Sequence, residues 1–185
     1  MNKKIYNFLM KLVISTAVVW LCTMTGAACK LPDGAYIHIG DVAVYLLALV
    51  MPLPIAIPAA AVGCAIADAT LGSVNYIFAT LIIKAVTVVA VKVLLKLSEK
   101  PLMQDILVCL GGVVTVCCCY VADVLKALNN TTSFIQAMLV SLDPVMYNVL
   151  QALICAVIYV FVSGFVRAYL EKKKIKETKQ EQQQE

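Results

Sequence analysis

Charged residues are scarce in this chain of 185 residues: they make up 14% of it, whereas 62% of the residues are hydrophobic. The mean hydropathy is +0.91, and one small soluble core cannot bury so many apolar side chains. At about 20 residues per spanning helix, the length has room for five or six spans and short loops, without a separate soluble domain. The composition therefore predicts a single all-α integral membrane domain.

The sequence also lacks the patterns that indicate catalysis or nucleic-acid binding. It has one histidine and neither H-E-x-x-H nor G-x-S-x-G, so it offers no metal site and no nucleophile with its base. The phosphate-loop pattern G-x-x-x-x-G-K-[ST] is absent, as is the interleaving of aromatic and basic residues typical of single-stranded nucleic-acid binding. We expect a protein that is not an enzyme and has no metal, cofactor or nucleic-acid partner.

Cysteine is the one metal-binding residue type that is plentiful, with eight copies, but no C-x-x-C spacing occurs. Cys117, Cys118 and Cys119 are consecutive, so on a helix they point in three directions and cannot converge on one metal ion. The others lie singly in apolar stretches. We therefore expect the cysteines to be packing residues.

The number of spans depends on an uncharged stretch, residues 42–67, which contains Pro52, Pro54 and Pro58. It predicts either one kinked helix or two shorter helices that meet near residues 51–54. Cytoplasmic loops collect Lys and Arg, and each added span reverses the side of everything downstream. Six spans place most of the 15 basic residues on the cytoplasmic side, whereas five spans export the lysines of residues 92–100 and the basic tail.

The charge distribution thus favours a six-helix bundle with cytoplasmic N- and C-termini. The spans are expected at about residues 12–29, 41–51, 54–70, 76–97, 102–125 and 144–169, within one domain over residues 1–170. Residues 171–185 are mostly Lys, Glu and Gln, so they predict a solvated or frayed cytoplasmic tail.

Polar side chains form a stripe along one face of each of the last three predicted spans. A charged group deep in a bilayer costs about 2.5 to 3.5 kcal/mol, so it needs a partner, a cavity or a short path to water. The stripes are Thr80, Lys84 and Thr87; Cys119, Asp123 and Lys126; and Asn148, Gln151, Cys155 and Tyr159. They lie mostly toward the outer side and predict a pocket open to the exterior. The alternative is that these side chains form interhelical hydrogen bonds that hold the bundle together. The inner halves are almost purely aliphatic, which does not support a pore.

The outer segment, residues 30–41, joins the first two spans and contains His38. It is placed to cover the pocket, but Asp41 can equally be a helix cap and His38 an interface residue. Asp68 ends the third span, where a carboxylate is unfavourable for the helix dipole and calls for a cation such as Lys84. Lys84 itself can bind a ligand, pair with Asp68 for folding alone, or extend to the outer interface.

The stretch from His38 to Lys84 resembles the substrate-binding S components of energy-coupling factor (ECF) importers, in particular the riboflavin-type and hydroxymethylpyrimidine-type group. The matching motifs are Ile39-Gly40-Asp41, Gly63-Cys64-Ala65-Ile66-Ala67-Asp68 with Gly72, and Thr80-Leu81-Ile82-Ile83-Lys84. The resemblance implies a six-span protein of the bacterial plasma membrane that captures a water-soluble vitamin or vitamin precursor from outside. It also implies docking on a shared transmembrane coupling subunit that two cytoplasmic ATPase subunits drive.

The resemblance and the stripes together predict one binding site for a small flavin, pyrimidine or pyridine compound. Lys84 and Asp68 would be charged anchors, Asn148 and Gln151 would recognise ring heteroatoms, and an aromatic ring would stack on the ligand. The expected substrate-binding residues are Lys84, Asp68, Asp41, His38, Thr80, Asn148, Gln151, Tyr147 and Tyr120.

The family usually has small residues four apart on the first span, for docking the coupling subunit. Here Ala17 is followed at that spacing by Leu21, so Thr23 and Ala27 are the nearest substitute. Two other functions also fit the sequence. A six-span structural or assembly protein of the cell-shape type would use the stripes as helix contacts and bind no small molecule. A self-sufficient facilitator would need polar residues in the inner leaflet.

Overall fold

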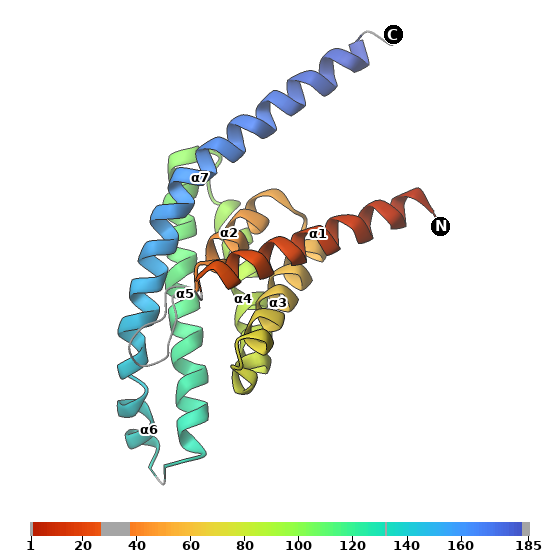
Figure 1. Cartoon of the computed structure of the whole chain (residues 1–185). Helices are drawn as coiled ribbons and strands as arrows, with labels where there is room; N and C mark the ends of the chain where they lie inside the picture. The colour runs from red at the N-terminus through yellow and green to blue at the C-terminus, as the bar shows by residue number, and fades with distance from the viewer. Residues whose placement is uncertain (1, 27–37, 132, 183–185) are drawn as a thin grey trace.

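The computed structural model describes residues 2–26, 38–131 and 133–182, and over these ranges the regular structure is entirely helical (Figure 1). The elements are α1 (Lys3–Gly26), α2 (Gly40–Val50), α3 (Leu53–Thr70), the 3-10 helix η1 (Val74–Tyr76), α4 (Ile77–Leu95), α5 (Pro101–Leu128), α6 (Phe134–Val140) and α7 (Asp143–Gln182). The predicted all-α class is therefore confirmed.

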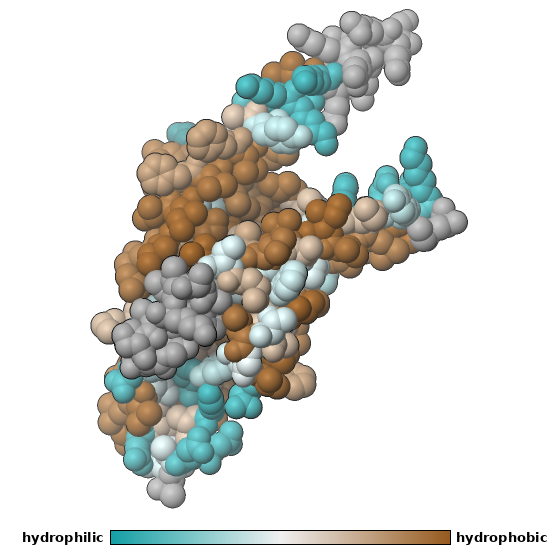
Figure 2. All heavy atoms as spheres, in the orientation of Figure 1, coloured by the Kyte–Doolittle hydropathy of each residue, from teal (hydrophilic) through white to brown (hydrophobic). Residues whose placement is uncertain are grey.

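Five of these helices, α1, α3, α4, α5 and α7, are long and apolar enough to cross a membrane. The apolar helix α2 has 11 residues, which give a length of only about 16 Å against a hydrocarbon core of about 30 Å. Figure 2 shows a hydrophobic surface over the middle of the molecule and hydrophilic residues at the projecting ends of α1 and α7. The chain is thus an all-α membrane protein, while the six-span count and the side on which the termini lie stay predictions.

The uncharged stretch forms two helices, as the charge count favoured, and Pro52 separates them. Met51 and Pro52 are both extended, with ψ angles of 149° and 151°, and α3 starts at the next residue. The exposed carbonyls at the end of α2 are bound from α4, since Lys92 Nζ donates to Ala48 O at 2.7 Å and Met51 O at 2.9 Å. This lysine caps α2 at a point where proline prevents the helix from continuing.

Two segments have structure that the sequence did not predict. Residues 134–140 form a short helix, α6, which is apolar but far too short to span a membrane and so was missed. Residues 171–182, expected to be solvated or frayed, are helical because α7 continues without a break to Gln182, and residues 171–176 are exposed on it. Lys, Glu and Gln are good helix formers, and after Gly164 the sequence contains no glycine or proline that would stop the helix.

The helices pack in a chain of neighbours, α1 on α3, α3 on α4, α4 on α5 and α5 on α7, with α2 in contact with α1, α3, α4 and α7. Both chain ends project at the end of the bundle where the α2–α3 and α4–α5 junctions lie, called the terminal end below (Figure 1). The opposite end, which carries α6, is called the α6 end. Residues 40–45 of α2 are all buried. The first turn of α2 thus brings any polar side chain it carries into the interior.

α1 approaches α3 closely at Gly63, where any side chain would collide. A Cβ atom there would lie 2.8 Å from the Cβ of Val19 and 2.9 Å from the carbonyl oxygen of Thr16. We expect Gly63→Leu to separate the two helices and to lower the free energy of unfolding by about 1 to 3 kcal/mol or more. Melting of the purified protein in detergent measures this. Gly164→Leu is the matched control, because a Cβ at Gly164 would meet nothing within 4 Å; equal losses in both variants would contradict the packing argument.

Candidate functional site

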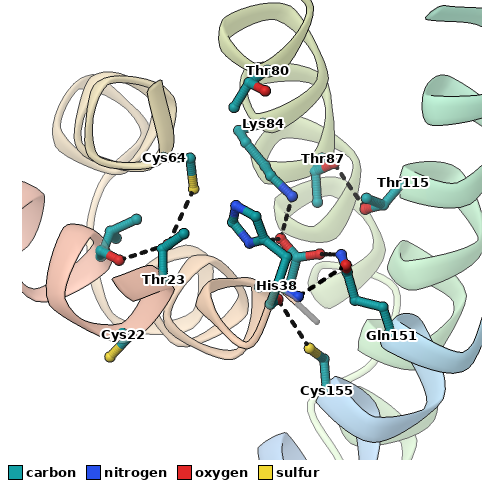
Figure 3. Close-up of polar contacts among 12 residues, drawn as sticks. Cys22, Thr23, His38, Cys64, Thr80, Lys84, Thr87, Thr115, Gln151 and Cys155 are labelled. Atoms are coloured by element: carbon teal, nitrogen blue, oxygen red, sulfur yellow. Dashed lines mark hydrogen bonds and ion pairs between the residues drawn. The ribbon is translucent and has the colours of Figure 1, made fainter. Parts of the chain in front are cut away.

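A buried ion pair at the centre of the bundle joins α2 to α4 (Figure 3). Lys84 Nζ donates a hydrogen bond to Asp41 Oδ1, and the two residues are only 4% and 1% exposed. The other carboxylate oxygen, Asp41 Oδ2, accepts from Nε2 of Gln151 on α7 at 2.9 Å. Three helices therefore present a cation, an anion and an amide to one point.

The segment that leads into α2 is tied to the same point by its backbone. His38 N donates to Gln151 Oε1 at 3.1 Å, and Cys155 Sγ, one turn along α7, donates to His38 O at 3.5 Å. The His38 ring is buried, with Nδ1 3.9 Å from Asp41 Oδ1. Burial and the charge of Lys84 lower the pKa of His38 to about 4, so its imidazole is neutral near pH 7. We call His38, Asp41, Lys84 and Gln151 the central polar cluster.

A second polar contact lies one turn away along α4, toward the α6 end. Thr80 Oγ1 donates to Asp68 Oδ2 of α3, whose residue is 4% exposed. The predicted pairing of Lys84 with Asp68 is therefore wrong, because Asp41 takes the lysine and a threonine hydroxyl satisfies Asp68. Asp41 also does not cap α2: the N-cap position is Ile39, and no side chain within the described part of the chain caps it.

The stripe on α4 faces the interior along its whole length. On the terminal side of Lys84, the hydroxyls of Thr87 and Thr115 share a hydrogen bond of 2.9 Å between α4 and α5, and both residues are buried. Thr80, Lys84 and Thr87 thus each bind a different neighbouring helix, α3, α2 and α5. This confirms that the α4 stripe faces other helices and not lipid.

The remaining predicted residues lie elsewhere. Tyr120 is bound to α6, where its hydroxyl donates to Met138 O at 3.3 Å, so it stands apart from the central polar cluster. Tyr147 and Asn148 are half-buried, about one turn before Gln151 on α7. On the α5 stripe, Lys126 lies over the ring of Tyr76, 3.9 Å from its centroid.

The residues predicted for docking differ in exposure. Ala17 lies exposed on α1, whereas Thr23 is fully buried. The Thr23 hydroxyl donates to Val19 O at 2.8 Å and lies 3.9 Å from Cys64 Sγ of α3 (Figure 3). Ala27 falls outside the residues that the structure describes.

Sequence reasoning missed a polar group near the terminal end, between α5 and α7. Arg167 lies 2.9 Å from Asp105 Oδ1 through NH2 and donates to Pro101 O at 3.0 Å through NH1. Ser163 Oγ donates to the same carboxylate oxygen at 3.1 Å. The expectation that this half of the bundle is almost purely aliphatic is therefore wrong. The available signal was a carboxylate, Asp105, inside a predicted span, which required a partner.

Comparison with known families decides what kind of protein carries this cluster. The family model for the S component of the ECF-type riboflavin transporter matches residues 7–169. The chain belongs to this family. Neither the search of curated proteins nor that of solved structures gave a match. This S component is therefore a substrate-binding, non-catalytic subunit of a transporter and a multi-pass membrane protein. S components of this family work with a shared coupling subunit and ATPases.

Proposed function

We propose that this S component binds a small water-soluble vitamin or vitamin precursor of the flavin, pyrimidine or pyridine type at the central polar cluster. One observation carries the proposal: Asp41, Lys84 and Gln151 converge from three helices and are held in the interior. Replacing a buried ion pair with apolar residues is often neutral or stabilising, so stability alone does not explain why the pair is kept. An ionisable residue at such a depth is by default a functional residue.

The cluster has hydrogen-bonding capacity beyond its internal contacts. The Lys84 ammonium has three N–H groups and uses one on Asp41, while the Gln151 amide uses one of its two N–H groups there. The remaining donors suit ring nitrogens or carbonyl oxygens of a heteroaromatic ligand, and carboxylate lone pairs suit its hydroxyl or N–H groups. Asp68 and Thr80 lie next along α4 and extend the proposed site toward the α6 end.

The proposed orientation follows from basic residues that gather at the terminal end. Lys92 and Lys96 lie near the end of α4, Lys100 precedes α5, and five lysines follow the apolar part of α7 in the sequence. Cytoplasmic segments collect such residues, so the terminal end faces the cytoplasm and the α6 end faces outward, with six spans when α2 and α3 are counted separately. The central polar cluster is then reached from outside, through the bacterial plasma membrane's outer leaflet.

The same orientation assigns the proposed partners to their sides. A shared transmembrane coupling subunit would contact the exposed face of α1 that carries Ala17, and two ATPase subunits would act from the cytoplasm. The ATPases supply the energy, because no phosphate-loop pattern occurs in this chain.

The proposal is tested by thermal melting of the purified protein against riboflavin, pyridoxine, hydroxymethylpyrimidine, thiamine, pantothenate, niacin, folate and biotin. A ligand at 100 times its dissociation constant stabilises the folded state by about 2.7 kcal/mol, which shifts the melting temperature visibly. We expect one neutral heteroaromatic compound to do so. If folded protein responds to none of the panel, the proposed ligand class is wrong and the structural or assembly function gains support.

The contribution of Gln151 is testable once a ligand is known. We expect Gln151→Leu to weaken ligand binding at least tenfold, about 1.4 kcal/mol, because the Asp41 carboxylate and the backbone of His38 lose the group that orients them. Isothermal titration of the detergent-solubilised variant measures this. Tyr120→Phe serves as the control and should bind like the parent, since the Tyr120 hydroxyl contacts α6. Equal losses of affinity in Gln151→Leu and Tyr120→Phe would mean that the ligand binds elsewhere.

A further inference from the structure

The end of α7 carries a basic face that the proposed ligand site does not use. Tyr169, Lys172, Lys173 and Lys176 are spaced three, four and seven residues apart, so they lie on one side of the helix. Together with Ile175 they line a shallow hollow of about 440 Å³. We call these five residues the α7 basic face.

This face is solvent-accessible and strongly charged. Tyr169 is 68% exposed and Ile175 50% exposed, and Lys172, Lys173 and Lys176 are exposed as well. Two acidic residues flank this face in the sequence. Glu171 lies two positions after Tyr169, on the opposite side of the helix, whereas Glu177 follows Lys173 by four positions, so three lysines outnumber one acidic residue on this side. Figure 2 shows hydrophilic residues around this end of α7, beyond the hydrophobic surface of the bundle.

The face continues a lipid-facing surface directly. Phe161 and Phe165, two turns and one turn before Tyr169, are 72% and 80% exposed on the apolar part of α7. Tyrosine is typical of the level where hydrocarbon meets headgroups, and lysines just beyond that level extend into the headgroup region. Along α7, the exposed side chains therefore change from phenylalanine to tyrosine to lysine, in the order expected from the hydrocarbon core of a membrane leaflet to its headgroup surface.

We propose that the α7 basic face binds the phosphate headgroups of anionic lipids in the surrounding membrane. The three ammonium groups provide complementary charge, and Tyr169 and Ile175 provide apolar contact for the glycerol and upper acyl region. Each lysine near an anionic membrane surface strengthens association about fivefold. This contact would hold the projecting part of α7 against the membrane surface instead of in the aqueous phase.

The test uses the full-length protein in detergent micelles, titrated with phosphatidylglycerol or phosphatidylcholine of identical acyl chains and followed by native mass spectrometry. The ratio of the two dissociation constants isolates the headgroup, because the acyl contacts are the same. We expect phosphatidylglycerol to bind at least tenfold more tightly. The preference should fall to within about twofold in K172Q/K173Q/K176Q and persist in K172R/K173R/K176R.

The matched control is K3Q/K4Q/K11Q, which removes the same charge from exposed positions of α1 and should keep the preference. Melting temperatures verify that all variants fold. Excess inorganic phosphate should not displace the lipid, and displacement would identify a free-phosphate site instead. An absent preference, or one that the glutamine variant retains, overturns the proposal. If the glutamine variant instead fails to assemble with its ATPase partners while showing no lipid effect, the face is a protein interface and the proposal is wrong.

Discussion

Replacing Lys84 with methionine is expected to lower the free energy of unfolding by about 3 to 5 kcal/mol, because it leaves a buried carboxylate without its cation. Asp41 is 1% exposed, and its remaining side-chain donor is the amide of Gln151. Reversible unfolding in mixed micelles of mild and denaturing detergent measures this loss of stability. Lys126→Met is the control: Lys126 is exposed and lies over Tyr76, a contact worth about 0.5 to 1 kcal/mol. Similar losses of stability in Lys84→Met and Lys126→Met would show that the Lys84–Asp41 pair is not buried as described.

A second variant separates the structural role of Lys84 from its proposed role in binding. In Lys84→Met/Asp41→Asn no uncompensated charge remains, so we expect at least half of the lost stability to return. Ligand binding should stay undetectable in this double variant, because both proposed charged contacts are gone. Restored stability together with parental affinity would remove Asp41 and Lys84 from the ligand site while leaving them as folding residues.

The second large effect is expected at Arg167, on the part of α7 that lies toward the terminal end. Arg167→Met removes the group that holds α5 to α7 through Asp105 and Pro101. The central polar cluster lies 16 residues away on α7, about 24 Å along the helix. We therefore expect ligand affinity to change less than twofold, while uptake into proteoliposomes that contain the partner subunits falls at least tenfold, because the ends of α5 and α7 that the proposed orientation assigns to the cytoplasm are no longer fixed for the partners.

Arg167→Lys is the informative control for this variant. It keeps the charge opposite Asp105 but loses the planar group that also reaches the carbonyl of Pro101, so its uptake should be intermediate. Loss of affinity in Arg167→Met would instead mean that the pair supports the whole bundle. Unchanged uptake in both variants would show that the pair has no part in transport.

Most of the helices were predictable because a membrane span leaves a strong local signal. Apolar runs located α1, α3, α4, α5 and α7, and prolines located the break between α2 and α3. Two segments were not predicted, because their local sequence gives no strong signal. The seven residues of α6 are too few to stand out from a connecting segment. The end of α7 has the composition of a solvated tail, and only the absence of glycine and proline indicates that it stays helical.

The central polar cluster was predicted as single residues but not as a network. Lys84 and Gln151 were selected because polar groups in a span need partners, and His38 and Asp41 because the outer segment, residues 30–41, is placed to cover the pocket. Their pairing depends on α2 lying at the middle of the bundle, which no local pattern reveals. Asp41 resembles a helix cap because it stands at the start of α2, and Asp105 was overlooked although it lies inside the predicted span 102–125.

α7 is one unbroken helix that connects two separate polar groups, the central polar cluster and the Arg167–Asp105 ion pair. Gln151 donates a hydrogen bond to Asp41 of the central polar cluster, and Arg167 pairs with Asp105. Gln151 and Arg167 both lie on α7, with no proline between them. A tilt of about 5° centred on Gln151 displaces Arg167 by about 2 Å over that distance, enough to open a 2.9 Å ion pair. In the proposed orientation, a ligand that tilts α7 at the central polar cluster would thereby open this ion pair on the other side of the membrane.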